Sequence, residues 1–110
     1  MIDTVLQAIA EPRRRDILRL IHVAELSSGE IAARFDVTRP AISQHLQVLA
    51  AAGLVKVRKD GTRRLYSARP EGLADLRAFL ETFWDDNLLR LKQEAEAEER
   101  RHVRDDTAAE

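Results

Sequence analysis

The sequence predicts a mainly helical fold with one small β-hairpin, and three observations support this fold class. Apolar residues recur at steps of three and four over five stretches of the 110-residue chain, as they do on one face of a helix. Between Val55 and Ala68 the period changes to two, and Asp60-Gly61 marks a hairpin tip. The composition, 45% apolar and 34% charged, is typical of a soluble, helix-rich domain.

The first three helices are predicted from the residues that start them. Asp3 can cap the first, and Pro12 suits the first position of the second because its missing N–H needs no partner there. Ser27 and Glu30 have the spacing of a capping box, which opens the third helix. The three apolar faces comprise Val5, Leu6 and Ile9, then Ile17, Leu18, Leu20 and Ile21, and then Ile31, Ala32 and Phe35.

The fourth helix, Arg39 to Ala51, follows a short turn at Asp36 and Val37. Thr38 caps this helix, and Gly53 ends it as a left-handed residue would. One face of the helix is apolar and the other is polar, with Ile42, Leu46 and Leu49 on the first and Arg39, Ser43, Gln44 and Gln47 on the second.

The hairpin that follows is basic, and its register has two alternatives. A two-residue turn at the tip pairs Val57 with Arg64, which mixes apolar and charged residues on one face. A three-residue loop from Asp60 to Thr62 pairs Val57 with Leu65 and Arg58 with Arg64, so the pattern favours this longer loop. The cationic side chains of the hairpin are Lys56, Arg58, Lys59, Arg63 and Arg64.

A helix, a turn, a second helix and a basic hairpin, in this order, indicate a winged helix-turn-helix. The formal net charge of the chain is only −1, but its parts differ: residues 1–37 carry −1, residues 38–69 carry +6 and residues 70–110 carry −6. A short helix with outward polar groups fits a DNA major groove, and a cationic ribbon beside it can follow the phosphates. The sequence therefore predicts a DNA-binding protein.

Pro70 opens a final helix whose apolar stripe is long for the small domain it could cover. One interpretation is a core helix that folds back on its own domain. The interpretation that we favour is a two-fold dimer, in which this stripe and the first helix meet a second copy of the chain. The predicted interface residues are Val5, Leu6, Ile9, Leu76, Leu80, Phe83, Trp84 and Leu88. A dimer would hold two reading helices about one DNA turn apart and would require an operator with inverted half-sites.

The domain organisation is predicted to be simple. Residues 1–92 form the DNA-binding and dimerisation domain, and residues 93–110 form a charged tail that frays and becomes disordered. Nothing near the N-terminus has the pattern of a signal peptide or a membrane span, so we expect a cytoplasmic protein without membrane contact.

Several function classes are disfavoured by the residues that are present. There is no cysteine, so a disulfide or a thiolate metal site cannot form, and we expect neither metal nor cofactor. The histidines at 22, 45 and 102 fall on three different predicted elements, and no glycine-rich phosphate loop occurs, so we expect no enzyme activity. A winged helix that only docks another protein is the remaining alternative, but such a surface would present apolar anchors in place of the +6 segment.

Five landmarks, in order, resemble ArsR-type winged-helix repressors over residues 3 to 92. The first is Ala10-Glu11-Pro12-Arg13-Arg14-Arg15-Asp16-Ile17-Leu18, which is similar to the family's ALADPTRRRIL opening. The others are Glu30-Ile31-Ala32, Ser43-Gln44-His45-Leu46-Gln47-Val48-Leu49, Gly53-Leu54-Val55 and Gly61 followed by Tyr66. The resemblance implies a homodimeric transcriptional repressor that acts on its own operon and is released by an effector.

The resemblance also suggests which residues contact DNA. Positions Thr38, Arg39, Ser43, Gln44, His45 and Gln47 fall on the family's recognition helix, and Arg58, Lys59, Arg63 and Arg64 fall on its wing. An arginine suits guanine and a glutamine suits adenine in the major groove. For His45 a partly buried packing role is the alternative.

One departure from the family concerns the trigger for release. Where many members carry a C-V-C stretch for soft metals, this sequence reads Ser27-Ser28-Gly29. A thiolate sensor is therefore excluded, and the effector would be a small organic molecule or a protein, if the chain responds to one at all.

Overall fold

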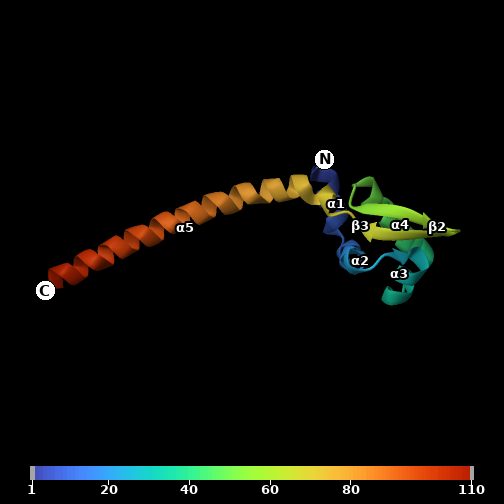
Figure 1. The fold of residues 1–110 in the computed structure, drawn as a ribbon, viewed down its shortest axis with the longest axis horizontal. Helices are drawn as coiled ribbons and strands as arrows, with labels where there is room; N and C mark the ends of the chain where they lie inside the picture. Colours follow the sequence, from blue (N-terminus) through green and yellow to red (C-terminus); the bar gives the residue numbers. More distant parts are fainter. Residues whose placement is uncertain (1, 110) are drawn as a thin grey trace. The chain divides into compact units, whose positions relative to one another are not determined.

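The computed structural model describes residues 2–109, without the side chains of residues 85–88 and 102–109. The chain divides into two units between Leu76 and Arg77. The elements in order are α1 (Ile2–Ala10), α2 (Pro12–Val23), β1 (Leu26–Ser27), α3 (Ser28–Phe35), α4 (Arg39–Ala51), β2 (Val55–Asp60), β3 (Arg63–Ala68), the 3-10 helix η1 (Pro70–Leu73) and α5 (Ala74–Ala109) (Figure 1). The predicted fold class, a mainly helical winged helix-turn-helix with five helices and a hairpin, is confirmed.

The predicted caps fix the ends of the helices in the first unit. Ser27 Oγ accepts a hydrogen bond from the Glu30 N–H at 3.2 Å, and Glu30 Oε1 accepts one from the Ser27 N–H at 3.1 Å, which completes the capping box of α3. Thr38 Oγ1 accepts from the Ala41 N–H at 3.3 Å at the start of α4. Between α3 and α4, Asp36 adopts a left-handed conformation with φ of 53°, and this closes the turn that sets one helix against the other.

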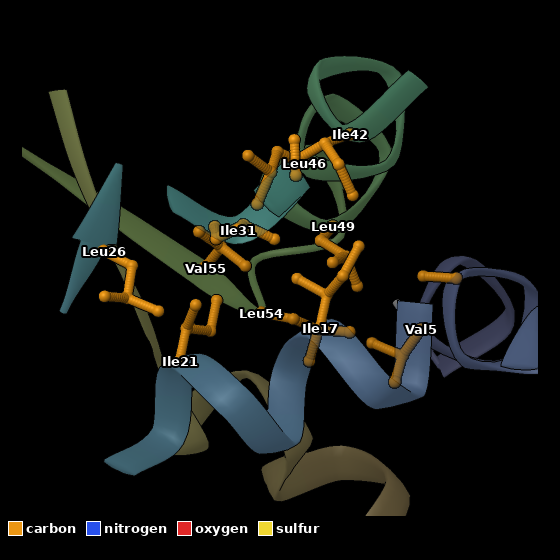
Figure 2. Close-up of a cluster of buried hydrophobic side chains, with 12 residues drawn as sticks. Val5, Ile17, Ile21, Leu26, Ile31, Ile42, Leu46, Leu49, Leu54 and Val55 are labelled. Carbon is orange, nitrogen blue, oxygen red and sulfur yellow. The ribbon is translucent and has the colours of Figure 1, made fainter. Parts of the chain in front are cut away.

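The hydrophobic core joins all the helices of the first unit to the sheet. Seven side chains are almost completely buried: Ile17, Ile21, Ile31, Ile42, Leu46, Leu49 and Leu54 (Figure 2). They come from α2, α3, α4 and the turn after α4, so the periodicity read from the sequence points each helix to one core. Burial of each such side chain contributes about 1.5–3 kcal/mol relative to exposure, so this cluster fixes where α4 lies.

Arginines of α2 hold the C-terminal end of α1. Arg14 Nε donates to the Ala8 carbonyl oxygen at 2.6 Å, and Arg15 Nη1 donates to the Ile9 carbonyl oxygen at 2.7 Å. The last carbonyls of a helix have no partner within the helix, so these guanidinium groups replace the missing N–H donors. This contact fastens α1 to α2 across Glu11.

The sheet has three strands in the order β1-β3-β2, and both predicted hairpin registers are wrong. Val57 lies opposite Tyr66 and Arg58 lies opposite Leu65, with Gly61 and Thr62 as the two loop residues. The prediction assumed that apolar residues share one face. In the structure β1, which the sequence pattern did not reveal, pairs with β3, places Ser27 opposite Leu65, and so gives the second face an apolar residue of its own.

In the second unit, α5 continues through Ala109. The boundary predicted between residues 92 and 93 lies within this helix and stays a prediction. The described apolar side chains of the unit are exposed, and Phe79 and Phe83 pack edge to face with ring centroids 5.1 Å apart. No helix in the described part of the chain is long and apolar enough to cross a membrane.

Candidate nucleic-acid interface

The outer face of α4 is polar because its inner face is committed to the core. Ile42, Leu46 and Leu49 are buried, and this orientation leaves Arg39, Gln44 and Gln47 exposed and Ser43 half-buried. Four of the six residues predicted for base or phosphate contact therefore lie on an accessible helical surface. A helix held rigidly by its apolar face can present such groups to a groove without first being ordered.

The other two predicted residues of the helix are engaged inside the protein. The hydroxyl of Thr38 is the N-cap of α4. His45 is half-buried, and its Nδ1 lies 3.4 Å from Arg14 Nη1. Burial, followed by the nearby charge of Arg14, lowers the pKa of His45 below its ordinary value of 6.5, so the ring is neutral at pH 7. Sequence analysis had kept this packing role for His45 as its alternative.

The register of the hairpin divides its cations between two faces. Lys59 lies opposite Arg64, on the face that also carries Val57 and Tyr66. A groove of about 300 Å³ separates this face from α4 and is lined by Ser43 and Gln47 of the helix and by Arg64, Val57 and Tyr66 of the wing. Lys59 and Arg64 thus belong to the same surface as the polar face of α4.

Two of the predicted wing arginines form ion pairs with acidic residues of other elements. Arg58 Nη2 donates to Glu25 Oε1 at 2.6 Å, across β3, and Arg63 donates to the Glu30 carboxylate. The hydrogen bond from Arg58 is the main cause of the lowered pKa of Glu25. For Glu30 the backbone N–H of Ser27 is the main cause, and Arg63 adds to it.

Sequence analysis missed Glu25 and Glu30 as neighbours of the wing. Both residues lie outside the +6 segment, and they approach it only because β1 pairs with β3. Since β1 is two residues long, no periodicity could reveal it. The pairs partly neutralise the cations on which the charge prediction depended.

Arg39, at the start of α4, lies with wing arginines and apart from the middle of the helix. A cleft of about 440 Å³ is lined by Arg39, Arg63 and Arg64, together with the backbone around Gly29. The Arg39 side chain crosses Gly29, because a Cβ atom placed there would come within 3.4 Å of Arg39 Nε. Three guanidinium groups around one cleft form a site suited to an anionic group.

Comparison with known proteins matches this geometry to one family. A family model described as a helix-turn-helix domain matches residues 9–58. The chain is 48% identical to the HTH-type transcriptional regulator Rv2034 of Mycobacterium tuberculosis over 82 residues, which are 74% of this chain and 77% of that protein. It is 34% identical to the transcriptional repressor SdpR of Bacillus subtilis over 74 residues, 67% of this chain and 82% of the relative.

A solved structure agrees with these matches. It is the solution structure of the homodimeric winged helix-turn-helix DNA-binding domain Mb0332 of Mycobacterium bovis, described as a possible ArsR-family regulator. The two folds superpose with a TM-score of 0.63 at 33% identity, over 79% of this chain and 81% of that one. The chain belongs to the ArsR family of transcriptional regulators. The family consists of regulators and not of enzymes.

The residues predicted for an ArsR-type dimer interface fall into different environments. Val5 is 3% exposed and belongs to the core, whereas Leu6 is 42% exposed. Ile9 and Leu76 are half-buried against the core. Along α5, Leu80, Phe83 and Trp84 are 41%, 53% and 60% exposed, and the side chain of Leu88 lies outside the described residues.

The described residues of this ArsR-family chain contain no group of three or more histidine, cysteine, aspartate or glutamate side chains placed to hold a metal ion. The stretch that carries thiolates in many family members forms β1 and the start of α3, where Ser27 and Ser28 stand. Ser27 is used there as a helix cap. The side chains at this position thus serve the fold and the arginine cleft.

Proposed function

We propose that this chain is a homodimeric repressor that binds operator DNA sequence-specifically, with its own operon among its targets. One observation carries the proposal: the polar face of α4 and the cationic face of the wing border one groove, through Ser43 and Gln47 on one side and Arg64 on the other. A duplex can then be read by the helix and held by the wing at the same time.

The proposal gives the residues of α4 two different roles. Gln44 and Gln47 are exposed near the middle of the helix, where an amide can pair with an adenine edge in the major groove. Arg39 shares its cleft with two wing arginines, and a backbone phosphate is the part of DNA that three cations would hold. The sequence-based assignment of Arg39 to guanine is therefore replaced by a phosphate contact.

Dimerisation and repression are supported by similar proteins and by the exposed apolar residues. The similar domain from Mycobacterium bovis is homodimeric, and the relative from Bacillus subtilis is a repressor. The exposed Leu80, Phe83 and Trp84 of α5 are apolar side chains that a second copy would cover. A two-fold dimer would bind an inverted repeat.

The trigger of the proposed repressor is not a thiolate-bound metal, because the chain has no cysteine. An organic effector or a protein would have to bind elsewhere.

The test compares two duplexes of equal length at moderate salt, one from the DNA upstream of this protein's gene and one of random sequence. Fluorescence anisotropy should show tighter binding to the upstream duplex, with affinity that falls steeply as salt rises. Gln44→Ala should lower the ratio of the two affinities about tenfold, as loss of a bidentate base contact does. Arg39→Ala should weaken binding to both duplexes by the same factor.

The matched control is Gln7→Ala, because Gln7 is an exposed glutamine on α1 and should leave both affinities unchanged. Equal affinity of the unmodified protein for the two duplexes would contradict sequence-specific binding and would favour a protein-docking winged helix. If Arg39→Ala changed the ratio while Gln44→Ala did not, the two roles assigned on α4 would be wrong.

A further inference from the structure

The first unit contains an apolar cleft that shares no lining residue with the two clefts of the DNA-facing surface. Its volume is about 270 Å³, and its apolar walls are Leu18 of α2, Leu54 after α4, Ala68 at the end of β3 and Leu73 of η1. Ligand sites for drug-sized molecules usually enclose about 300–1,000 Å³, so this cleft suits a smaller molecule.

The walls of this cleft are held by the backbone. The Arg69 N–H donates to the Leu54 carbonyl oxygen at 2.8 Å, and Arg69 Nη1 donates to the Gly53 carbonyl oxygen at 3.1 Å. Gly72 of η1 comes so close to the same turn that a Cβ atom there would lie 2.1 Å from the Gly53 oxygen. These contacts hold the cleft open without a ligand, which lowers the free-energy cost of binding one.

The charged groups that line the cleft are all basic. Arg19, His22 and Arg69 line it with exposed side chains, and no acidic residue is among its lining residues. Arg19 does lie 3.3 Å from Asp16, but both side chains are largely exposed, and such a pair is weak in water. An apolar interior with a basic rim matches a molecule that has an apolar body and one carboxylate.

We propose that this cleft binds a small apolar carboxylate and that such a ligand is the effector of the protein. The effector role rests on the proposed function. Leu54 follows α4 through the turn at Gly53, and Ala68 ends the wing strand β3, so a bound ligand would contact the segments that position both DNA-reading elements. Binding that shifts these segments lowers DNA affinity, and by linkage DNA lowers ligand affinity by the same factor.

Octanoate is the probe, and titration calorimetry of the full chain without DNA is the first measurement. We expect saturable binding of one octanoate per chain, with 1-octanol binding about tenfold more weakly because it cannot form charge-assisted hydrogen bonds. Arg19→Gln should remove most of this preference for the carboxylate. Arg34→Gln, at an exposed arginine of α3 outside the cleft, should keep it.

A second variant tests the place of binding. Ala68→Phe should fill the cleft and abolish binding of both octanoate and octanol, whereas Ala33→Phe at an exposed position of α3 should leave binding unchanged. The Arg19 and Arg34 variants carry the test if Ala68→Phe fails to fold. Equal affinity for octanoate and octanol, or octanoate binding that survives Ala68→Phe in a folded protein, would overturn the site.

The effector role is measured separately, by DNA anisotropy with and without saturating octanoate. We expect DNA affinity to fall about fivefold or more, within the usual range of allosteric coupling, and Arg19→Gln to reduce this effect. Octanoate that binds without changing DNA affinity would overturn the effector role and leave the binding site standing. A failure of the proposed function itself would appear in the arm without octanoate, as equal affinity for the two duplexes.

Discussion

The side chain of Arg14 connects the recognition helix to α1 through His45. Arg14 Nη1 lies 3.4 Å from His45 Nδ1, while Nε of the same guanidinium donates to the Ala8 carbonyl oxygen at 2.6 Å. A neutral imidazole can accept a hydrogen bond from an arginine, which is always a donor. Protonation of the ring would remove the acceptor and place two positive charges side by side.

This contact predicts a dependence of stability on pH. The pKa of His45 in the folded protein lies below its ordinary 6.5, mainly through burial, so the unfolded chain binds more protons as the pH falls below that value. The contribution of the neutral ring is fully present above pH 6.5 and is lost as the pH falls toward the folded pKa. Urea unfolding at about pH 7.5 and about pH 5.5 should show the lower free energy of unfolding at the acidic pH.

His45→Gln should reduce this pH dependence, since an amide does not titrate in that range. The exposed His22→Gln is the matched control and should keep the dependence of the unmodified protein. A His45→Gln protein with unchanged pH dependence would mean that another group causes it.

The two faces of the wing predict different effects for two arginines of one hairpin. Arg64 lies on the face beside α4, whereas Arg58 is paired with Glu25 on the other face. Arg64→Ala should weaken DNA binding and reduce the slope of log affinity against log salt by about 0.9, the value for one lost phosphate contact. Arg58→Ala should change the slope little. Equal slopes for Arg64→Ala and the unmodified protein would remove Arg64 from the interface.

The exposed apolar side chains of α5 predict where the dimer forms. Leu80 and Phe83 are 41% and 53% exposed, and the double variant Leu80→Glu and Phe83→Glu would place two charges in the proposed interface. We expect the mass in solution, measured by light scattering, to fall from that of a dimer to that of a monomer. Val23→Glu, at an exposed valine of α2, should remain a dimer, and a dimeric double variant would move the interface elsewhere.

The approach of η1 to the turn after α4 predicts a position that accepts no side chain. A Cβ atom on Gly72 would lie 2.1 Å from the Gly53 oxygen, so Gly72→Ala must displace backbone. We expect a loss of about 1–3 kcal/mol or more in the free energy of unfolding by urea. Gly61→Asn is the comparison, because φ of 65° at the open hairpin tip suits asparagine and should cost little. Equal stability of Gly72→Ala and the unmodified protein would contradict this approach.

Patterns that are local in the chain were readable from the sequence. The capping box of Ser27 and Glu30, the Thr38 cap and the buried face of α4 depend on residues three or four apart, so spacing alone revealed them. The same spacing placed Gln44 and Gln47 on the outer face. Membership of the winged helix-turn-helix class followed from the order of these local elements.

Contacts between distant segments were decided only by the tertiary structure. The ion pairs of Glu25 with Arg58 and of Glu30 with Arg63 each join residues 33 positions apart, and they exist because the two-residue β1 pairs with β3. The register of the hairpin depended on that same strand, which gives Leu65 a neighbour on the second face. A strand of two residues has no period, and packing between segments has no local signature. The sequence by itself therefore determined which elements form and which face of α4 reads outward, whereas the folded chain decided which cations that surface retains.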